Sequence, residues 1–84
     1  MKSHEERKNE HQSTKDLVAK NLRVLRLAHN YTTTEVAKAI GVASWAYRTY
    51  ESATSLPSFI TLNKICEFYR LNSPTSLIGE ITVK

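Results

Sequence analysis

The chain has 84 residues, 24% of them charged and 40% hydrophobic, and its formal net charge is +4 at pH 7. This length suffices for one small domain with a single aliphatic core. The single cysteine excludes an internal disulfide and fits a reducing compartment. No apolar run reaches the length of a membrane span or a signal-peptide core, so we expect neither membrane insertion nor secretion. The positive charge agrees with a polyanionic partner without requiring one.

The first 13 residues contain no apolar side chain after Met1 and mix basic with acidic residues. Such a segment cannot bury enough surface to offset the entropy lost on ordering, so we expect a flexible polar tail. Two alternatives remain open. One is an arm that follows the DNA backbone or minor groove, which the three glutamates of the segment disfavour. The other is an extension of the first helix, which the E-E-R-K sequence favours.

Ser13 and Asp16 form a helix-capping signature and predict a first helix over about residues 14–29. One face of this helix carries residues at helical spacing: Val18, Leu22, Leu25 and His29.

Residues 32–51 predict two further helices joined by a tight turn. Thr32 and Glu35 complete a T-x-x-E capping box, so a helix starts at the next residue after Thr32. Its apolar stripe consists of small residues: Val36, Ala37 and Ile40. Gly41 ends this helix, where a left-handed residue is needed. The next helix starts at Ser44 or around Ala43.

The C-terminal part predicts two more helices. Ser58, after Pro57, caps a fourth helix that runs through Arg70. Its residues at core spacing are Phe59, Leu62, Ile65, Cys66 and Tyr69. The pair Ser73-Pro74 starts a short fifth helix that continues through about residue 78 and is stopped by Gly79.

The pattern A-x-x-x-G-V at 37–42, followed by Y-x-x-Y-E at 47–51, resembles the helix-turn-helix of the lambda-repressor-like, XRE-type DNA-binding domains. The similarity extends from L-x-x-L-R at 22–26 to about residue 78. It implies an all-α, compact five-helix domain over residues 14–79, between a polar tail at 1–13 and a short extended tail at 80–84. In this family the second helix of the motif enters the major groove.

The resemblance also implies a largely buried ion pair between Arg26 and Glu51, with a structural role. Three positions depart from the family pattern. Thr33 stands where glutamine is most frequent, Ala43 where serine is frequent, and Ala53 where glycine is usual. Because a positive φ is unfavourable for alanine, a different turn is an option after Glu51.

Residues on the outer face of the second motif helix are the candidates for base reading: Ser44, Trp45, Arg48 and Thr49. Arg48 can bond guanine O6 and N7 together, although it could also be a solvated helix charge. Trp45 could cover thymine methyl groups or pack over the turn. The candidates for phosphate contact are Thr32, Thr33, Thr34, Lys38, Thr54 and Ser55, with Lys15 and Lys20 as further basic candidates.

The end of the chain is more apolar than one small helix can hide. Its apolar residues are Leu77, Ile78, Ile81 and Val83. This end therefore either closes the core or forms a dimer contact, which the resembling family commonly builds around its last helix.

These features favour a sequence-specific DNA-binding transcriptional regulator, a repressor, acting in the cytoplasm of a bacterium on the nucleoid and encoded by the host or a phage. Its partner would be double-stranded DNA, bound as a homodimer at half-sites roughly 34 Å apart. The alternative is a helical protein-interaction module, such as an antitoxin-like or co-regulator subunit, that presents Trp45 and tyrosine side chains to a protein.

An enzyme is disfavoured, because the sequence offers no nucleophile with a base and no clustered ligand set. Cys66 is isolated in an apolar segment, and the three histidines are scattered. We therefore expect no catalytic residue, no metal site and no cofactor.

Overall fold

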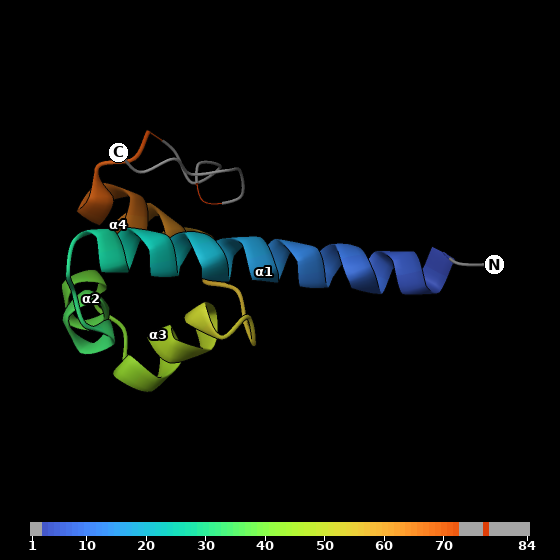
Figure 1. Cartoon of the computed structure of the whole chain (residues 1–84), viewed down its shortest axis with the longest axis horizontal. Helices are drawn as coiled ribbons and strands as arrows, with labels where there is room; N and C mark the ends of the chain where they lie inside the picture. The colour runs from blue at the N-terminus through green and yellow to red at the C-terminus, as the bar shows by residue number, and fades with distance from the viewer. Residues whose placement is uncertain (1–2, 73–76, 78–84) are drawn as a thin grey trace.

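The computed structural model describes residues 3–72 and residue 77, and for residues 3–11 only the course of the backbone. Four helices are present in this part of the chain: α1 (Ser3–Ala28), α2 (Thr33–Ile40), α3 (Ser44–Glu51) and α4 (Phe59–Tyr69). The three short helices gather around the C-terminal half of α1 (Figure 1). The described residues form no strand, so the predicted all-α class is confirmed for them. None of these helices has the length and apolar character that crossing a bilayer requires.

Helix α1 begins at Ser3, well before the predicted start at residue 14. Ser13, the expected N-cap, lies inside the helix, where the Gln12 side chain donates a hydrogen bond of 3.0 Å to Asp16. The N-terminal half of α1 projects beyond the other helices (Figure 1). The predicted helix start was therefore wrong, and the alternative of an extended first helix matches the structure. The physical reason is that a helix already nucleated by its buried C-terminal half continues easily through helix-favouring residues.

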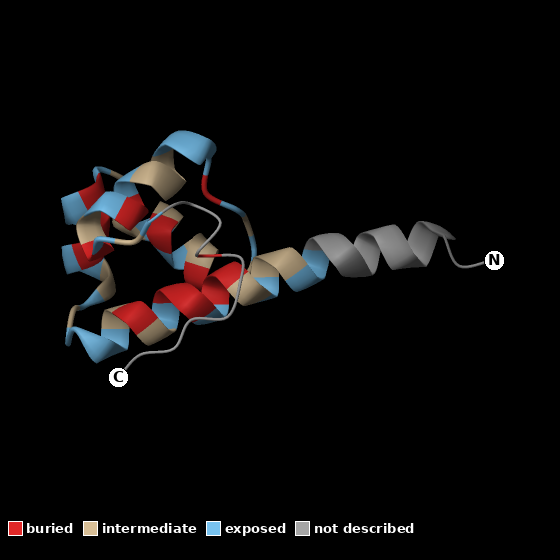
Figure 2. Cartoon of the chain, turned by 90° about the horizontal axis from the view of Figure 1, so that it is seen from above, coloured by how far each residue is buried: buried red, intermediate tan, exposed pale blue. Residues whose placement is uncertain are grey.

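The core lies where the C-terminal half of α1 meets the short helices, as the buried residues in Figure 2 show. Its buried members come from every helix: Val18, Leu22, Leu25, Val36, Ala37, Ile40, Tyr47, Ile65, Cys66, Tyr69 and Leu77. The predicted apolar stripe of α2 is thereby confirmed, as are Val18, Leu22 and Leu25 on α1. His29, predicted for the same face of the first helix, is exposed and lies just beyond the end of α1. Burial raises the pKa of the Cys66 thiol, as expected for a cysteine that fills space in a core.

Phe59 was predicted for the core and is exposed instead. Ser58 caps α4 as expected, with its hydroxyl accepting a hydrogen bond from the backbone N–H of Thr61 at 3.2 Å. Helical spacing then places Phe59 in the first turn, at the edge of the face that carries Ile65 and Tyr69. Pro57, just before the helix, is buried at this end of α4.

Leu77 is fully buried, and the Asn21 side-chain amide donates a hydrogen bond of 2.6 Å to its carbonyl oxygen. This residue therefore closes the core of its own chain and is not available as a dimer contact. The other dimer candidates, Ile78, Ile81 and Val83, lie outside the described residues. So does the predicted fifth helix, apart from Leu77.

The ion pair expected from the resemblance joins α1 to the end of α3. Arg26 Nε lies 2.7 Å from Glu51 Oε2, and Arg26 Nη2 lies 3.0 Å from Glu51 Oε1. The Tyr47 hydroxyl donates to the same Glu51 Oε2 at 2.6 Å, and Arg23 Nη1 donates to the Glu51 backbone carbonyl at 2.6 Å. Arg26 also donates to the Tyr31 carbonyl at 3.1 Å. One carboxylate thus accepts three hydrogen bonds and fixes α3 against α1.

The two side chains that donate to the Glu51 carboxylate, Arg26 and Tyr47, both have raised pKa values. The hydrogen bond to Glu51 raises the pKa of the Arg26 guanidinium above its ordinary value. Burial, assisted by the hydrogen bond to Glu51, raises the pKa of the Tyr47 phenol. Each group therefore remains a donor to the carboxylate throughout the neutral range.

Ala53 follows α3 with a φ of 63°, in the left-handed region. The sequence left open a different turn at this position, because alanine disfavours such a conformation. The structure instead keeps the left-handed turn and accepts the strain. The backbone N–H groups of Thr54 and Ser55 return to the Thr49 carbonyl at 3.0 and 3.2 Å, which holds the turn closed.

The substitution Glu51→Gln tests the ion pair. It leaves the Arg26 guanidinium half-buried without an opposite charge, so we expect the free energy of unfolding to fall by about 3–5 kcal/mol. The matched control is Glu67→Gln on the exposed face of α4, which should change it by no more than about 0.5 kcal/mol. Urea unfolding measures both. Equal effects of the two variants would contradict a structural role for the pair.

The substitution Ala53→Gly tests the strain in the turn. Glycine adopts a positive φ without the Cβ clash, so we expect the free energy of unfolding to rise by about 0.5–1 kcal/mol. Ala39→Gly, on the exposed face of α2, is the control and should lower it by about 0.5–1 kcal/mol. Thermal or urea unfolding of the wild type and the two variants measures both changes in the free energy of unfolding. A lower free energy of unfolding for Ala53→Gly would show that the turn is not strained.

Candidate nucleic-acid interface

The N-terminus of α2 is built by the predicted capping box, which is confirmed. The Thr32 hydroxyl accepts from the Glu35 backbone N–H at 3.1 Å, and Glu35 Oε1 accepts from the Thr32 backbone N–H at 2.8 Å. The capping box therefore fixes the start of α2 at Thr33. Thr34 is exposed beside it, and Thr33 is half-buried. The positive end of the helix dipole lies here, where a phosphate would be favoured.

The turn between α2 and α3 has the predicted left-handed residue, since Gly41 has a φ of 77°. The Val42 backbone N–H donates to the Ala37 carbonyl at 3.0 Å, and the Val42 side chain packs against the core. Ala43 occupies the N-cap of α3 and makes no side-chain hydrogen bond. Because alanine has no side-chain acceptor, the first backbone N–H groups of α3 have no side-chain cap.

Helix α3 divides into a fixed and a free face. Tyr47 and Glu51 are buried and hold the helix to α1 and the core. Trp45 is 69% exposed, and Arg48 is exposed on the outside. Ser44 is half-buried at the first turn. The structure therefore places a tryptophan and an arginine together on the outer surface of the short helix.

Thr49 differs from the other three base-reading candidates. Its hydroxyl donates to the Ala46 carbonyl at 2.6 Å and shares a hydrogen bond of 2.6 Å with the Ser55 hydroxyl. Both hydroxyls thus help to shape the turn after α3, which makes them less available to a nucleic acid. Thr54, by contrast, is exposed, with its hydroxyl 2.8 Å from that of Ser52.

The phosphate candidates lie on both sides of α3. Figure 1 shows α3 between α2 and the turn that follows α3. Thr32, Thr33 and Thr34 are on the α2 side, and Thr54 and Ser55 are on the turn side. A helix flanked in this way by N–H and hydroxyl groups has the arrangement that a major-groove reader uses to hold the two backbones.

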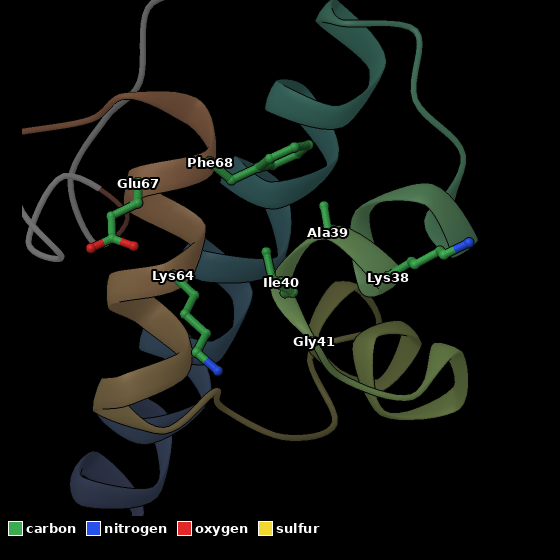
Figure 3. A pocket seen from close by; sticks show the side chains of 7 residues that line it. All are labelled: Lys38, Ala39, Ile40, Gly41, Lys64, Glu67 and Phe68. Carbon is green, nitrogen blue, oxygen red and sulfur yellow. The ribbon is translucent and has the colours of Figure 1, made fainter.

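An open groove of about 470 Å³ lies between α2 and α4. Its charged lining residues are Lys38, Lys64 and Glu67. Figure 3 shows the Lys64 side chain directed towards the Gly41 turn, whereas Lys38 and Glu67 point away from the groove. A Cβ atom on Gly41 would lie 3.8 Å from Lys64 Nζ, so the ammonium group sits by the C-terminus of α2, where a positive charge is stabilising. No trio of potential metal-binding side chains occurs within the described part of the chain.

Sequence reasoning missed two features of the described structure near this surface. The first is Arg23, which donates to the Glu51 backbone carbonyl at the end of α3. Because Arg23 lies three residues before Arg26 on α1, the two arginines share a helix face, and this spacing could have indicated the contact. The second feature is the exposure of three apolar side chains around the start of α4, of which the helical pattern had assigned Phe59 to the core: Leu56, Phe59 and Ile60.

Comparison with protein families identifies a match to the family described as Helix-turn-helix over residues 22–75, more than half of the chain. The matched range starts on α1 and contains α2 and α3 in full. Searches of curated proteins and of solved structures gave no significant match. The chain belongs to the XRE-type, lambda-repressor-like helix-turn-helix family, which is a family of DNA-binding regulators.

Proposed function

We propose that this protein is a sequence-specific transcriptional repressor that inserts α3 into the major groove of double-stranded DNA. The observation that carries the proposal is the division of α3 into two faces. Tyr47 and Glu51 anchor one face, and Trp45 and Arg48 are exposed on the other. A short helix held this rigidly can present side chains to base edges without a large ordering cost on binding.

Each exposed group on α3 has a chemical role in this proposal. The Arg48 guanidinium donates to guanine O6 and N7 together, which discriminates between bases by about 1–3 kcal/mol. Trp45 covers a thymine methyl group or a sugar edge. The hydroxyls of Thr34 and Thr54, with backbone N–H groups at the start of α2, bind phosphates and set the register. Ser44 and Thr49 contribute at the edges of the contact.

The protein acts as a homodimer in this proposal. Two copies read an inverted repeat whose half-sites lie about one helical turn, roughly 34 Å, apart. Repression follows if the bound dimer covers a promoter. The site of action is then the nucleoid of a bacterium, with the protein encoded by the host or a phage. The net charge of +4 supports attraction to the phosphate backbone.

A second candidate is a protein-interaction module of the antitoxin or co-regulator type. The exposure of Trp45 favours it, because tryptophan is enriched at the centres of protein interfaces. The two candidates differ in their use of Arg48, which a base-reading surface needs and an aromatic contact does not.

The DNA-binding proposal is tested by selecting bound sequences from random DNA at two salt concentrations and sequencing them. We expect an inverted-repeat motif and an affinity that falls steeply as salt rises. Arg48→Ala should cost about 1–3 kcal/mol and relax preference at one base position of each half-site. Arg48→Lys is the matched control, because it keeps the charge and loses the two-pronged contact. Equal weakening on all sequences would contradict base reading by Arg48.

Lys38→Ala tests a phosphate contact from α2. We expect an unchanged motif and a salt slope reduced by about 1, since one ion pair with the backbone is lost. Lys64→Ala is the control, because that side chain is directed towards the Gly41 turn (Figure 3). An unchanged slope for Lys38→Ala would remove this residue from the interface.

A further inference from the structure

The groove between α2 and α4 has a largely apolar wall. Its volume is 470 Å³, and its apolar lining residues are Ala39, Ile40 and Phe68. Ile40 is part of the core and Phe68 packs against it, so this wall is held in place by the fold. Small-molecule sites in proteins typically have volumes of about 300–1,000 Å³ and an apolar wall with a few polar groups. The groove therefore has the size and the surface of a small-ligand site.

The Lys64 side chain supplies the charge that faces this wall. It extends from α4 towards Gly41, where a Cβ atom would lie 3.8 Å from Lys64 Nζ. The charged ends of Lys38 and Glu67 point away from the groove (Figure 3). Glu67 therefore does not neutralise Lys64, and no other carboxylate of the described residues forms an ion pair with it. Because an ammonium group has three N–H donors, Lys64 can serve both the carbonyl end of α2 and a ligand.

A positive charge beside an apolar wall is complementary to an organic anion with an apolar body. A carboxylate accepts the charge-assisted hydrogen bond that Lys64 can donate. The apolar part of the same molecule can cover Ala39 and Phe68 and remove their surface from water. An organic cation would be repelled by Lys64, and a small inorganic anion would leave the apolar wall in water. The chemistry of the groove therefore selects a monocarboxylate with a short aliphatic chain or a single ring.

We infer that the groove between α2 and α4 binds a small amphipathic monocarboxylate, with Lys64 as its charge partner. The inference goes beyond the proposed DNA contact and does not depend on it. Trp45 and Arg48, on the outer face of α3, do not line the groove. The ammonium group of Lys38, a proposed phosphate contact, points away from it (Figure 3). The carboxylate and DNA can therefore be bound at the same time.

The shape of the groove sets the strength of this binding. A ligand in it would touch α2 and the Gly41 turn on one side and α4 on the other. Because the groove is open, part of the ligand stays in water, whereas tight small-molecule sites enclose most of the ligand surface. The affinity for a small carboxylate should therefore lie in the millimolar range.

NMR titration of the isotope-labelled full chain with hexanoate, without DNA, tests the inference. We expect saturable shifts at the backbone N–H groups of Ala39, Gly41 and Phe68. Acetate lacks the apolar chain and hexanamide lacks the charge, so each should bind at least about fivefold more weakly at the same ionic strength. This comparison separates a site that needs both features from general attraction of anions to a basic protein.

The substitution Lys64→Glu reverses the charge in the groove. It should weaken hexanoate binding by about tenfold and allow the hexylammonium ion to bind in its place. Lys20→Glu is the matched control, because it changes the net charge equally at an exposed position of α1 that does not line the groove. This control should bind hexanoate as the wild type does. Circular dichroism verifies that all three chains fold.

Equal affinities for hexanoate and hexanamide would overturn the inference, as would hexanoate binding that Lys64→Glu leaves unchanged. So would the absence of saturable shifts at tens of millimolar hexanoate. An acidic amphipathic peptide that binds the groove when hexanoate does not would also overturn it, because the occupant would then be a protein segment. None of these measurements uses DNA, so their failure is distinguished from failure of the DNA-binding proposal.

Discussion

The Glu51 carboxylate holds the proposed reading helix in place, and the rest of the surface depends on it. An isolated helix of eight residues is not stable in water, so α3 requires tertiary contacts to exist at all. Glu51 supplies such contacts to α1, because its carboxylate accepts two hydrogen bonds from Arg26 and its backbone carbonyl accepts one from Arg23. The Tyr47 hydroxyl, from α3 itself, donates to the same carboxylate and orients it. With only 8% of Glu51 exposed, water competes poorly for these bonds. The anchored side leaves the opposite side of α3 free for a ligand.

The parts of the fold that local chemistry controls were predictable from the sequence. Thr32 with Glu35, and Gly41 at the helix end, specify hydrogen bonds and a backbone angle within a few residues. Features that depend on longer stretches of the chain or on distant partners were not. The start of α1 depends on how far a nucleated helix continues, and the exposure of Phe59 depends on which part of α4 meets the core. The Arg26–Glu51 pair spans 25 residues and was predicted through family resemblance alone.

The candidate site shows the same division. Helical spacing predicted that Trp45 and Arg48 would share the outer side of α3, and both are exposed. It could not predict that the Thr49 hydroxyl binds Ser55, because that contact requires the folded turn. Nor could it decide the turn at Ala53, where bonds of the neighbouring backbone to Thr49 outweigh the residue's own preference.

Titration of the isotope-labelled protein with its selected DNA, followed by NMR, tests most directly whether the free face of α3 is the binding surface. The proposal predicts the largest shifts at the Trp45 indole N–H, the Arg48 side chain and the backbone N–H groups that begin α2. The buried Tyr47 should shift little, because its anchorage to Glu51 is complete before binding. Shifts concentrated around Phe59 and Ile60 at the start of α4, with Trp45 and Arg48 unchanged, would contradict DNA reading by α3.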